Sequence, residues 1–294
     1  MSAILQRLGL VTLARSAGLA GLLFLASSLL VFALESRGGA ALARYKSKSF
    51  VNDVVYSAFY RGGFYAVFVW ALVVNLLGTK LAFLQLHVLD SLPLYAAVPI
   101  YWIVGDLLLY WLHRAQHHLP WLWAFHSVHH AEQQLSTLSQ SRRHPAEQVL
   151  NGLAVHLPLV FVLGLPTRAW LPWYALAQML QSAQHAELDW RFGPLYRVVV
   201  SPVFHSIHHG TQERFFNRNF GQMFSSWDYL FGTASSATTR PAEYGVRGLV
   251  MRESLVAQLV APFRMFRRAA PAPAALDTEP GDSQVGATST TVSR

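Results

Sequence analysis

Residues 113–130 read HRAQHHLPWLWAFHSVHH and contain six histidines, directly after an apolar stretch. His113 and His117 are four residues apart and therefore share one face of a helix, whereas His118 points about 100° away from them. An i, i+3, i+4 spacing, which again defines one helical face, follows at His126, His129 and His130. A lone histidine at the end of a membrane segment is commonly an interfacial residue. This repeated spacing instead predicts a metal site.

The i, i+3, i+4 spacing recurs later in the chain, at His205, His208 and His209. His185 stands between the two regions, in the stretch QHAE. If the fold brings these segments together, about nine imidazoles converge. Since one ion takes about four to six ligands, this inventory suits two metal ions. His87 and His156 are isolated, and we expect them to be interfacial or core residues.

The composition predicts a membrane protein. Hydrophobic residues make up 53% of the 294 and charged residues only 13%, against roughly 25% charged in soluble domains. The net charge of +8 is therefore better explained by anionic lipid than by nucleic acid. The absence of cysteine excludes disulfides, Cys-ligated iron–sulfur clusters, thiolate haem and Cys-based zinc sites.

Apolar runs at 10–34, 54–77 and 92–112 are each long enough to cross roughly 30 Å of hydrocarbon. The first run could be a signal peptide. Its apolar core exceeds the ~7–15 residues of a signal sequence, which favours an uncleaved anchor. The second run is interrupted by Arg61 and two glycines, so its core is expected to begin near Phe64.

The block 149–183 is too long for one span and is broken at 164–168 and at Pro172. We expect a hairpin of two short helices with its bend near 164–168, which returns the chain to its starting side. Basic residues concentrate in the first loop, at Arg37, Arg44, Lys46 and Lys48, whereas Lys80 stands alone in the second. The positive-inside rule then places the first loop and all histidine groups in the cytoplasm.

These features predict an all-α integral membrane bundle of about four to five membrane helices, with one apolar hairpin and a cytosolic histidine-rich cap. Residues 1–91 would form an N-terminal membrane-anchoring region and 92–236 a catalytic domain. Segment 237–268 is a candidate interfacial amphipathic element, because apolar positions from Leu255 to Phe263 recur at helical spacing beside arginines; an ordinary packing helix is the alternative. The Ala/Pro/Thr/Ser-rich stretch 269–294 is expected to be a disordered tail.

The number and type of the candidate ligands restrict the kind of metal site that this chain could form. A zinc hydrolase typically uses three protein ligands and an open position, about half of what is available here. Soluble di-iron carboxylate proteins use Glu-x-x-His pairs, which this sequence lacks. Imidazole suits iron, zinc and copper alike. A pair of nitrogen-ligated ions at the mouth of an apolar bundle favours oxygen activation against a lipid C–H bond.

Two stretches also carry a family resemblance: YWLHRAQH followed by LWAFHSVHH, over 110–130, and PVFHSIHH at 202–209, closed by NFG at 219–221 and WDYLFGT at 227–233. They resemble the sterol desaturase/fatty acid hydroxylase superfamily over roughly 106–233. The short distance between the first two histidine groups distinguishes this pattern from that of acyl-lipid desaturases. The resemblance implies a membrane protein with a cytosolic, histidine-bound bimetal centre, usually di-iron, that hydroxylates or desaturates a lipid with O2.

The resemblance implies metal ligands at His113, His117, His126, His129, His130, His185, His205, His208 and His209. It leaves open whether His144, and less directly His118, also bind metal. Where the family often has Asn and Arg, this chain has Glu187 and Ser206, which weakens any transfer of substrate identity. Glu187 could accept a hydrogen bond from an imidazole or bind metal itself. Asp106, inside an apolar span, is expected to orient a ligand histidine, with a helix–helix bond as the alternative; Asp228 is expected to be structural.

The function predicted is therefore O2-dependent hydroxylation of a lipid, with two iron ions at the site and zinc as a metal that can replace them during purification. Desaturation at the same site is the alternative, and metal-ion transport is a more distant one. No nucleotide-binding or haem-attachment motif occurs in the sequence, so electrons are expected from a separate reductase, cytochrome or ferredoxin. In a bacterium, the protein would lie in the inner membrane with its histidine groups facing the cytoplasm.

Overall fold

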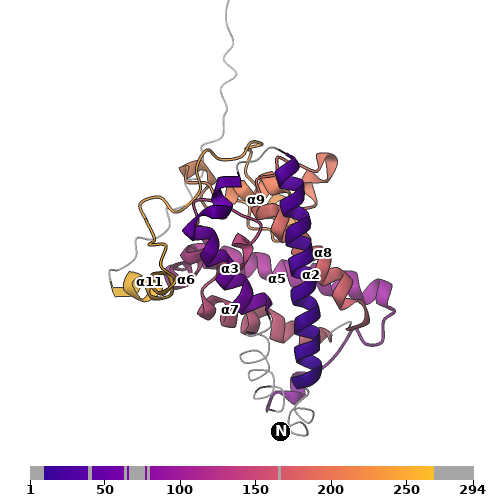
Figure 1. The fold of residues 1–294 in the computed structure, drawn as a ribbon. Helices are drawn as coiled ribbons and strands as arrows, with labels where there is room; N and C mark the ends of the chain where they lie inside the picture. Colours follow the sequence, from indigo (N-terminus) through magenta and orange to yellow (C-terminus); the bar gives the residue numbers. More distant parts are fainter. Residues whose placement is uncertain are drawn as a thin grey trace, which may run out of the picture.

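The computed structural model describes residues 10–38, 42–62, 65, 77, 80–164 and 167–267 (Figure 1). In these residues the chain is helical, and its only β-contacts are two isolated bridges, Gly210 with Tyr244 and Val246 with Leu249. The all-α prediction is confirmed. The α-helices are α2 (Leu10–Arg37), α3 (Lys48–Arg61), α5 (Leu94–His118), α6 (Pro120–His130), α7 (Pro145–Asn151), α8 (Thr167–His185), α9 (Pro202–His208), α10 (Ser226–Leu230) and α11 (Leu255–Arg267). Shorter helical turns are η1 (Leu42–Lys46), η3 (Ala82–Leu84), η4 (Ser139–Ser141), η5 (Gly152–His156), η6 (Leu159–Leu163), η7 (Gly193–Arg197) and η8 (Glu213–Phe215).

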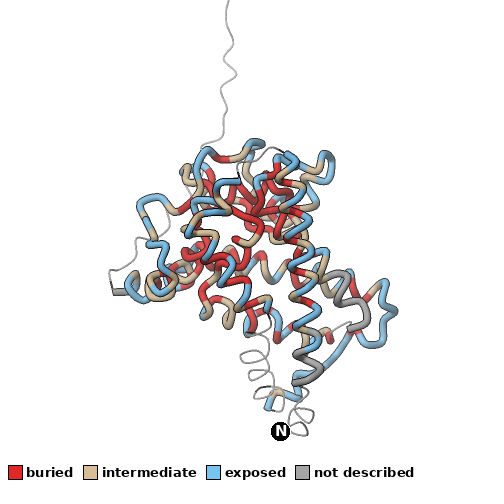
Figure 2. The backbone as a smooth tube through the Cα atoms, in the orientation of Figure 1, coloured by how far each residue is buried: buried red, intermediate tan, exposed pale blue. Residues whose placement is uncertain are grey.

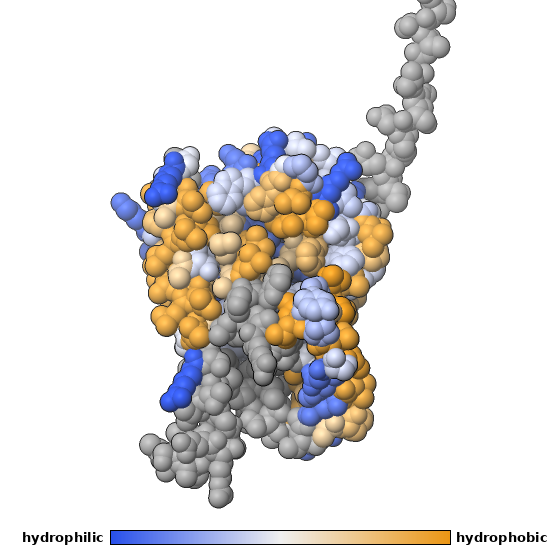
Figure 3. Space-filling view, turned by 90° about the vertical axis from the view of Figure 1, so that its right-hand side faces the viewer, coloured by the Kyte–Doolittle hydropathy of each residue, from blue (hydrophilic) through white to orange (hydrophobic). Residues whose placement is uncertain are grey.

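Three described helices are long and apolar enough to cross a membrane: Ala17–Arg37, Leu94–His118 and Pro145–Leu163. They correspond to the first and third predicted spans and to the first half of the predicted hairpin. The predicted span 54–77 lies largely outside the described residues, which show only its start in α3. With these helices, the protein is an integral membrane protein. Hydrophilic groups gather at one end of the molecule and apolar surface extends below them (Figure 3).

The predicted hairpin is present as two helical segments. The first, Pro145–Leu163, joins α7, η5 and η6; Pro158 lies between its two π-helical turns, which fits the missing N–H of proline in a helix interior. The segment ends at Gly164, whose φ of 81° is costly for residues with a side chain. Helix α8 then begins at Thr167, so the interruption lies within the predicted bend at 164–168.

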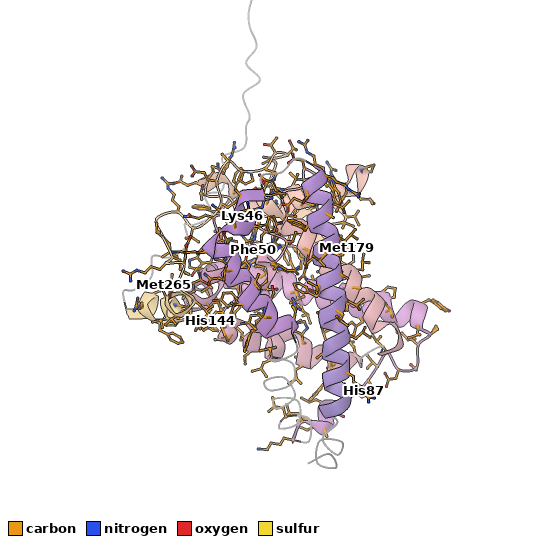
Figure 4. The ribbon with its side chains drawn as sticks, in the orientation of Figure 1. Lys46, Phe50, His87, His144, Met179 and Met265 are labelled. Atoms are coloured by element: carbon orange, nitrogen blue, oxygen red, sulfur yellow. The ribbon has the colours of Figure 1, made fainter. Side chains whose placement is uncertain are left out.

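The two ends of this hairpin lie far from its bend. Backbone amides of Val88 and Leu89 donate to the carbonyl groups of Val162 and Leu163, at 3.0 Å each, so the bend packs against the loop that contains His87. The ends of the two segments that lie away from the bend carry Glu147 and His185. Glu147 contacts His126, and His185 contacts His129. Figure 4 shows His87 at the end of the molecule opposite Lys46. The chain therefore returns to the histidine end after the hairpin, as the sequence predicts.

Helix α8 packs along α2, the long helix in the front of Figure 1. Their contact includes Val31 and Ala183, together with a buried hydrogen bond of 3.2 Å between Ser28 and Ser182. Buried residues concentrate in the upper half of the molecule, around α9 (Figure 2). The most buried part of the described chain is thus the cap, the end of the molecule that holds the histidines.

Candidate metal centre

The structure gathers nine buried histidines into two clusters. We call them site 1, formed by His113, His117, His126, His130 and His208, and site 2, formed by His129, His185, His205 and His209. In each cluster the potential ligand atoms all lie within 4.8 Å of one another. These are the nine histidines that the sequence predicts as metal ligands.

Helical geometry explains how neighbouring histidines serve different sites. Helix α5 ends at His118 and α6 begins at Pro120, because the residue before a proline avoids the helical region; the chain reverses there and α5 packs on α6. On α6, His126 and His130 are four residues apart and face site 1, whereas His129 faces site 2. The same spacing recurs on α9 and its C-cap, but there the outer pair serves the other site. His205 and His209 face site 2, and His208 faces site 1.

Hydrogen bonds fix the tautomer of several rings. A backbone carbonyl can only accept, so a ring nitrogen in contact with one carries the proton. His113 Nδ1 donates to Phe220 O at 2.8 Å, and His208 Nδ1 donates to Arg218 O at 2.8 Å. In site 2, His129 Nδ1 donates to Arg142 O at 3.2 Å, and His185 Nδ1 donates to Gln181 O at 2.9 Å. Each of these rings keeps its lone pair on Nε2.

The Nε2 atoms face one another within the clusters. The distance is 3.1 Å between His113 Nε2 and His126 Nε2, and 3.4 Å between His185 Nε2 and His129 Nε2. Because the Nδ1 atoms carry the protons, these are contacts between lone pairs, which repel unless a cation joins them. Two nitrogens bound about 2.1 Å from one ion lie roughly 3.0–3.4 Å apart, so the observed spacings suit metal ligands.

Unpartnered nitrogens in site 1 also fit a metal. Nε2 is buried without a hydrogen-bond partner in His117, His130 and His208. Such groups are costly in a protein interior unless a ligand satisfies them. Burial, with neighbouring imidazoles, lowers the pKa of His130, His205 and His209 well below the usual histidine value. These rings are therefore neutral at pH 7, which is the form that binds a metal.

The Asn-Phe-Gly motif positions the carbonyl that holds His113. Asn219 adopts φ 59° and its side chain donates to Phe204 O at 2.8 Å. The amides of Phe220 and Gly221 donate to the carboxylate of Asp228, at 2.7 and 2.8 Å. Asp228, expected to be structural, thus anchors the loop, although burial raises its pKa to about 6.

Asp106 does not contact a histidine, contrary to the expectation that it orients a ligand directly. Its carboxylate accepts hydrogen bonds from the amides of Met223 and Phe224, at 2.9 and 3.0 Å, and from the indole of Trp227 at 3.0 Å. It therefore ties α5 to the loop after the Asn-Phe-Gly motif. This is a bond between distant segments, close to the alternative role considered from the sequence.

Glu187 also differs from its expected role beside an imidazole or a metal. Its side chain is 45% exposed and pairs with Arg44, because the chain turns away from the centre after α8 ends at His185. Arg44 in turn pairs with the fully buried Glu35, which accepts a hydrogen bond from the Glu187 amide. Glu187 fastens the loop after α2 to the cap.

The two further candidate ligands lie outside both clusters. His144 uses both ring nitrogens: Nδ1 accepts from the Ala146 amide as the N-cap of α7, and Nε2 donates to Leu259 O, each at 3.1 Å. His118 is exposed, and its Nδ1 donates to Arg114 O at 2.7 Å. In this structure neither ring is directed at the metal centre.

Glu147 is a residue at the centre that the sequence reasoning missed. Its Oε1 accepts from His126 Nδ1 at 2.9 Å and pairs with Arg143 at 3.0 Å, with Glu147 itself 1% exposed. The signal available was a carboxylate in the first turn of an apolar helix, which is costly unless paired. Arg142 was missed too: its buried guanidinium pairs with Asp53 and Glu132 at 2.7 and 2.6 Å, which holds the carbonyl that His129 contacts.

Comparison with known proteins agrees with this centre. The sequence model of the fatty acid hydroxylase family matches residues 98–233, which hold all nine histidines. The chain is 30% identical to ornithine lipid hydroxylase OlsE of Rhizobium tropici over 176 residues, 59% of this chain and 52% of that protein. It is also 30% identical, over 128 residues, to alkylglycerol monooxygenase of Danio rerio and to lathosterol oxidase of Mus musculus, which covers 44% of this chain and 28% and 41% of theirs.

The matches thus span about half the length of the first of these relatives and less of the others. No solved structure matches the chain significantly.

Proposed function

Because the chain belongs to the sterol desaturase/fatty acid hydroxylase superfamily, we propose that it is a membrane-bound oxidoreductase that uses O2 to hydroxylate a C–H bond of a lipid. The observation that carries this proposal is the pair of buried imidazole clusters within the matched segment. Relatives named as lipid hydroxylase and monooxygenase support hydroxylation. A lathosterol oxidase among them keeps desaturation as the second candidate.

The proposal assigns five imidazoles to one iron ion and four to the other, as sites 1 and 2. When bound, the iron pair would supply the O2-activating chemistry that side chains lack. The protein's part is to hold the rings in one tautomer, through the carbonyls of Phe220, Arg142 and Arg218, and to keep water away by burial. Zinc suits the same nitrogen donors, so purified protein can carry it instead.

Metal transport has less support. Transport sites usually lie near the middle of the bilayer, on broken helices. Here the clusters form at one end of α5 and α8 and in the cap, with four of the nine rings tied to backbone carbonyls. A fixed centre suits catalysis better than release of an ion.

Substrate, electron donor and orientation also belong to the proposal. A lipid fits a centre at the end of apolar helices, and electrons would come from a separate reductase, cytochrome or ferredoxin. We place the histidine end in the cytoplasm, because the basic loop with Arg44, Lys46 and Lys48 lies at that end in the structure, where Arg44 pairs with Glu187.

The test is to express the wild-type chain and His208→Ala in a bacterial host under isotopically labelled O2, and to compare lipid masses. Hydroxylation predicts a lipid with one additional labelled oxygen atom in the wild type alone. Desaturation predicts a product that lacks two hydrogen atoms and carries no label. A product that takes its oxygen from water, or the same lipids in both strains when iron and a reductant are supplied, would contradict the oxygenase proposal.

A further inference from the structure

The nine clustered histidines differ in what their outer nitrogen contacts. In four of them, Nδ1 donates to a neutral backbone carbonyl: His113, His129, His185 and His208. In His205 and His209 this nitrogen has no partner. Among the described residues, His126 is the cluster histidine whose Nδ1 contacts a carboxylate, that of Glu147 at 2.9 Å.

Burial makes this hydrogen bond strong. The His126 and Glu147 side chains are 0% and 1% exposed, so no water competes for the contact and the local dielectric is low. When Nε2 of an imidazole binds a cation, positive charge spreads into the ring and the Nδ1 proton becomes a better donor. A carboxylate acceptor then stabilises the bound state more than a carbonyl does.

Arg143 explains how a carboxylate persists there. It lies four residues before Glu147, just ahead of α7, and its Nη1 contacts the same Oε1 at 3.0 Å, which compensates the cost of burying the charge. Oε2 of Glu147 has no partner. Oε1 therefore accepts from both Arg143 and His126. Arg143 thus competes with His126 for the negative charge that would stabilise a metal-bound imidazole.

From this asymmetry we propose that Glu147 is a positioning residue that makes the two metal positions inequivalent. Through His126 it strengthens metal binding at site 1, which also has the larger set of imidazoles, so that site 1 fills before site 2. In site 2 the outer ring nitrogens contact neutral carbonyl groups or have no partner. Site 2 therefore binds the second ion, and binds it more weakly. This inference rests on the proposed function only in its assignment of metal to both sites, and it requires no turnover.

The experiment is a titration of the metal-free full-length chain in detergent with Co2+, a divalent ion whose visible spectrum reports its coordination. Wild-type protein should bind in two phases, with the first spectrum that of the five-imidazole site. Glu147→Gln keeps the shape and an acceptor oxygen but removes the charge. It should weaken the first phase about 10–100-fold and leave the second unchanged. Glu187→Gln, which alters an exposed carboxylate outside the centre, is the matched control and should titrate like wild type.

Arg143→Gln separates a positioning role from a structural one. If Glu147 acts on the metal, removing its competing partner leaves the first phase as tight as in wild type or tighter. If the ion pair only holds the fold, both variants weaken both phases alike, and the proposal is overturned. Should Arg143→Gln fail to fold, Glu147→Gln still decides, since an unchanged first phase contradicts the proposal. A two-phase titration without lipid oxidation would contradict the proposed function and leave this inference standing.

Discussion

At the level of single residues, the division of labour within each histidine group matters most. His126 and His130 face one site, and His129, between them, faces the other. A ligand substitution should therefore affect one ion more than its neighbour, although turnover needs both.

We predict that His208→Ala lowers metal content from about two ions per chain to about one and abolishes turnover. The loss of activity should exceed the 10–100-fold typical when a residue that only hydrogen-bonds to a metal ligand is replaced, because here the ligand itself is removed. His205→Ala should do the same at site 2. Elemental analysis after anaerobic iron loading, with membrane insertion as the folding control, measures both.

His87→Ala is the control for these variants, since His87 lies at the far end of the molecule and is 45% exposed. It should keep wild-type metal content. A wild-type stoichiometry at or below one ion, in folded protein, would contradict the two-site assignment.

A second prediction at this scale concerns Gly221 in the Asn-Phe-Gly motif. A Cβ there would lie 2.6 Å from Phe224 O and 2.9 Å from the Asp228 carboxylate, and hydrogen bonds hold both the Phe224 amide and this carboxylate in place. Gly221→Ala should therefore destabilise the protein by about 1–3 kcal/mol and loosen the carbonyl that orients His113. Thermal unfolding and the metal affinity of site 1 measure the two effects.

Gly18→Ala provides the comparison, because nothing lies within 4 Å of that Cβ. In a helix it should be neutral or slightly stabilising. If Gly221→Ala unfolds at the same temperature as Gly18→Ala, the loop is not held as the structure indicates.

Site residues that the sequence predicted differ from those it missed in how far along the chain their contacts lie. The histidines share helical faces through i, i+3 and i+4 spacing, which is local and readable. The bonds of Asp106 go to Met223 and Phe224, more than a hundred positions away. Glu187 points outward because α8 ends two residues earlier, and Glu147 has no spacing relation to the histidine groups. Local periodicity cannot specify such contacts.

At the level of elements, the hairpin and the break between α5 and α6 were predictable because proline and glycine mark both. The role of α11 was not, since helical spacing suits a packing helix and an interfacial one equally. In the structure α11 packs on α6 through one face, where Phe263 contacts Phe125 and Ser127 donates to Met265. Val256 is 69% exposed, and Phe263 remains 51% exposed despite its contact with Phe125.

We predict that this exposed surface of α11 lies in the membrane interface, where apolar side chains enter the headgroup boundary and arginines meet anionic lipid. A single cysteine at Val256, labelled with an environment-sensitive fluorophore in reconstituted vesicles, should emit as in an apolar medium. It should also be quenched by brominated lipid.

Glu213, 72% exposed in the cap, gives the aqueous reference when labelled in the same way. Water-like emission from position 256 would instead make α11 an ordinary packing helix of the cap. Either result leaves the metal centre unaffected.

At the level of the whole molecule, two ends are clearly distinguished. One carries the clusters, the loop with Arg44 and Lys46, and the ends of α5 and α8; the other carries the hairpin bend at Gly164 and the loop with His87 (Figure 4). A shared centre requires every histidine group to reach the same side of the membrane, and the hairpin 145–185 meets this requirement because both of its ends lie at the clusters. Charge then sets the orientation, since the basic loop belongs to the cluster end.

The last prediction follows from this arrangement. The chain has no cysteine, so single cysteines report one position each: Gln134 after the second histidine group, Glu213 after the last one, and Lys80 near the opposite end, all exposed. An impermeant maleimide should label positions 134 and 213 only from the cytoplasmic side and position 80 only from the other. Labelling of 134 and 213 from opposite sides would rule out one shared centre and the oxygenase with it. Labelling of both from the non-cytoplasmic side would invert the orientation but preserve the centre, because the clusters depend on the hairpin whereas the direction of insertion depends on the charges of the first loop.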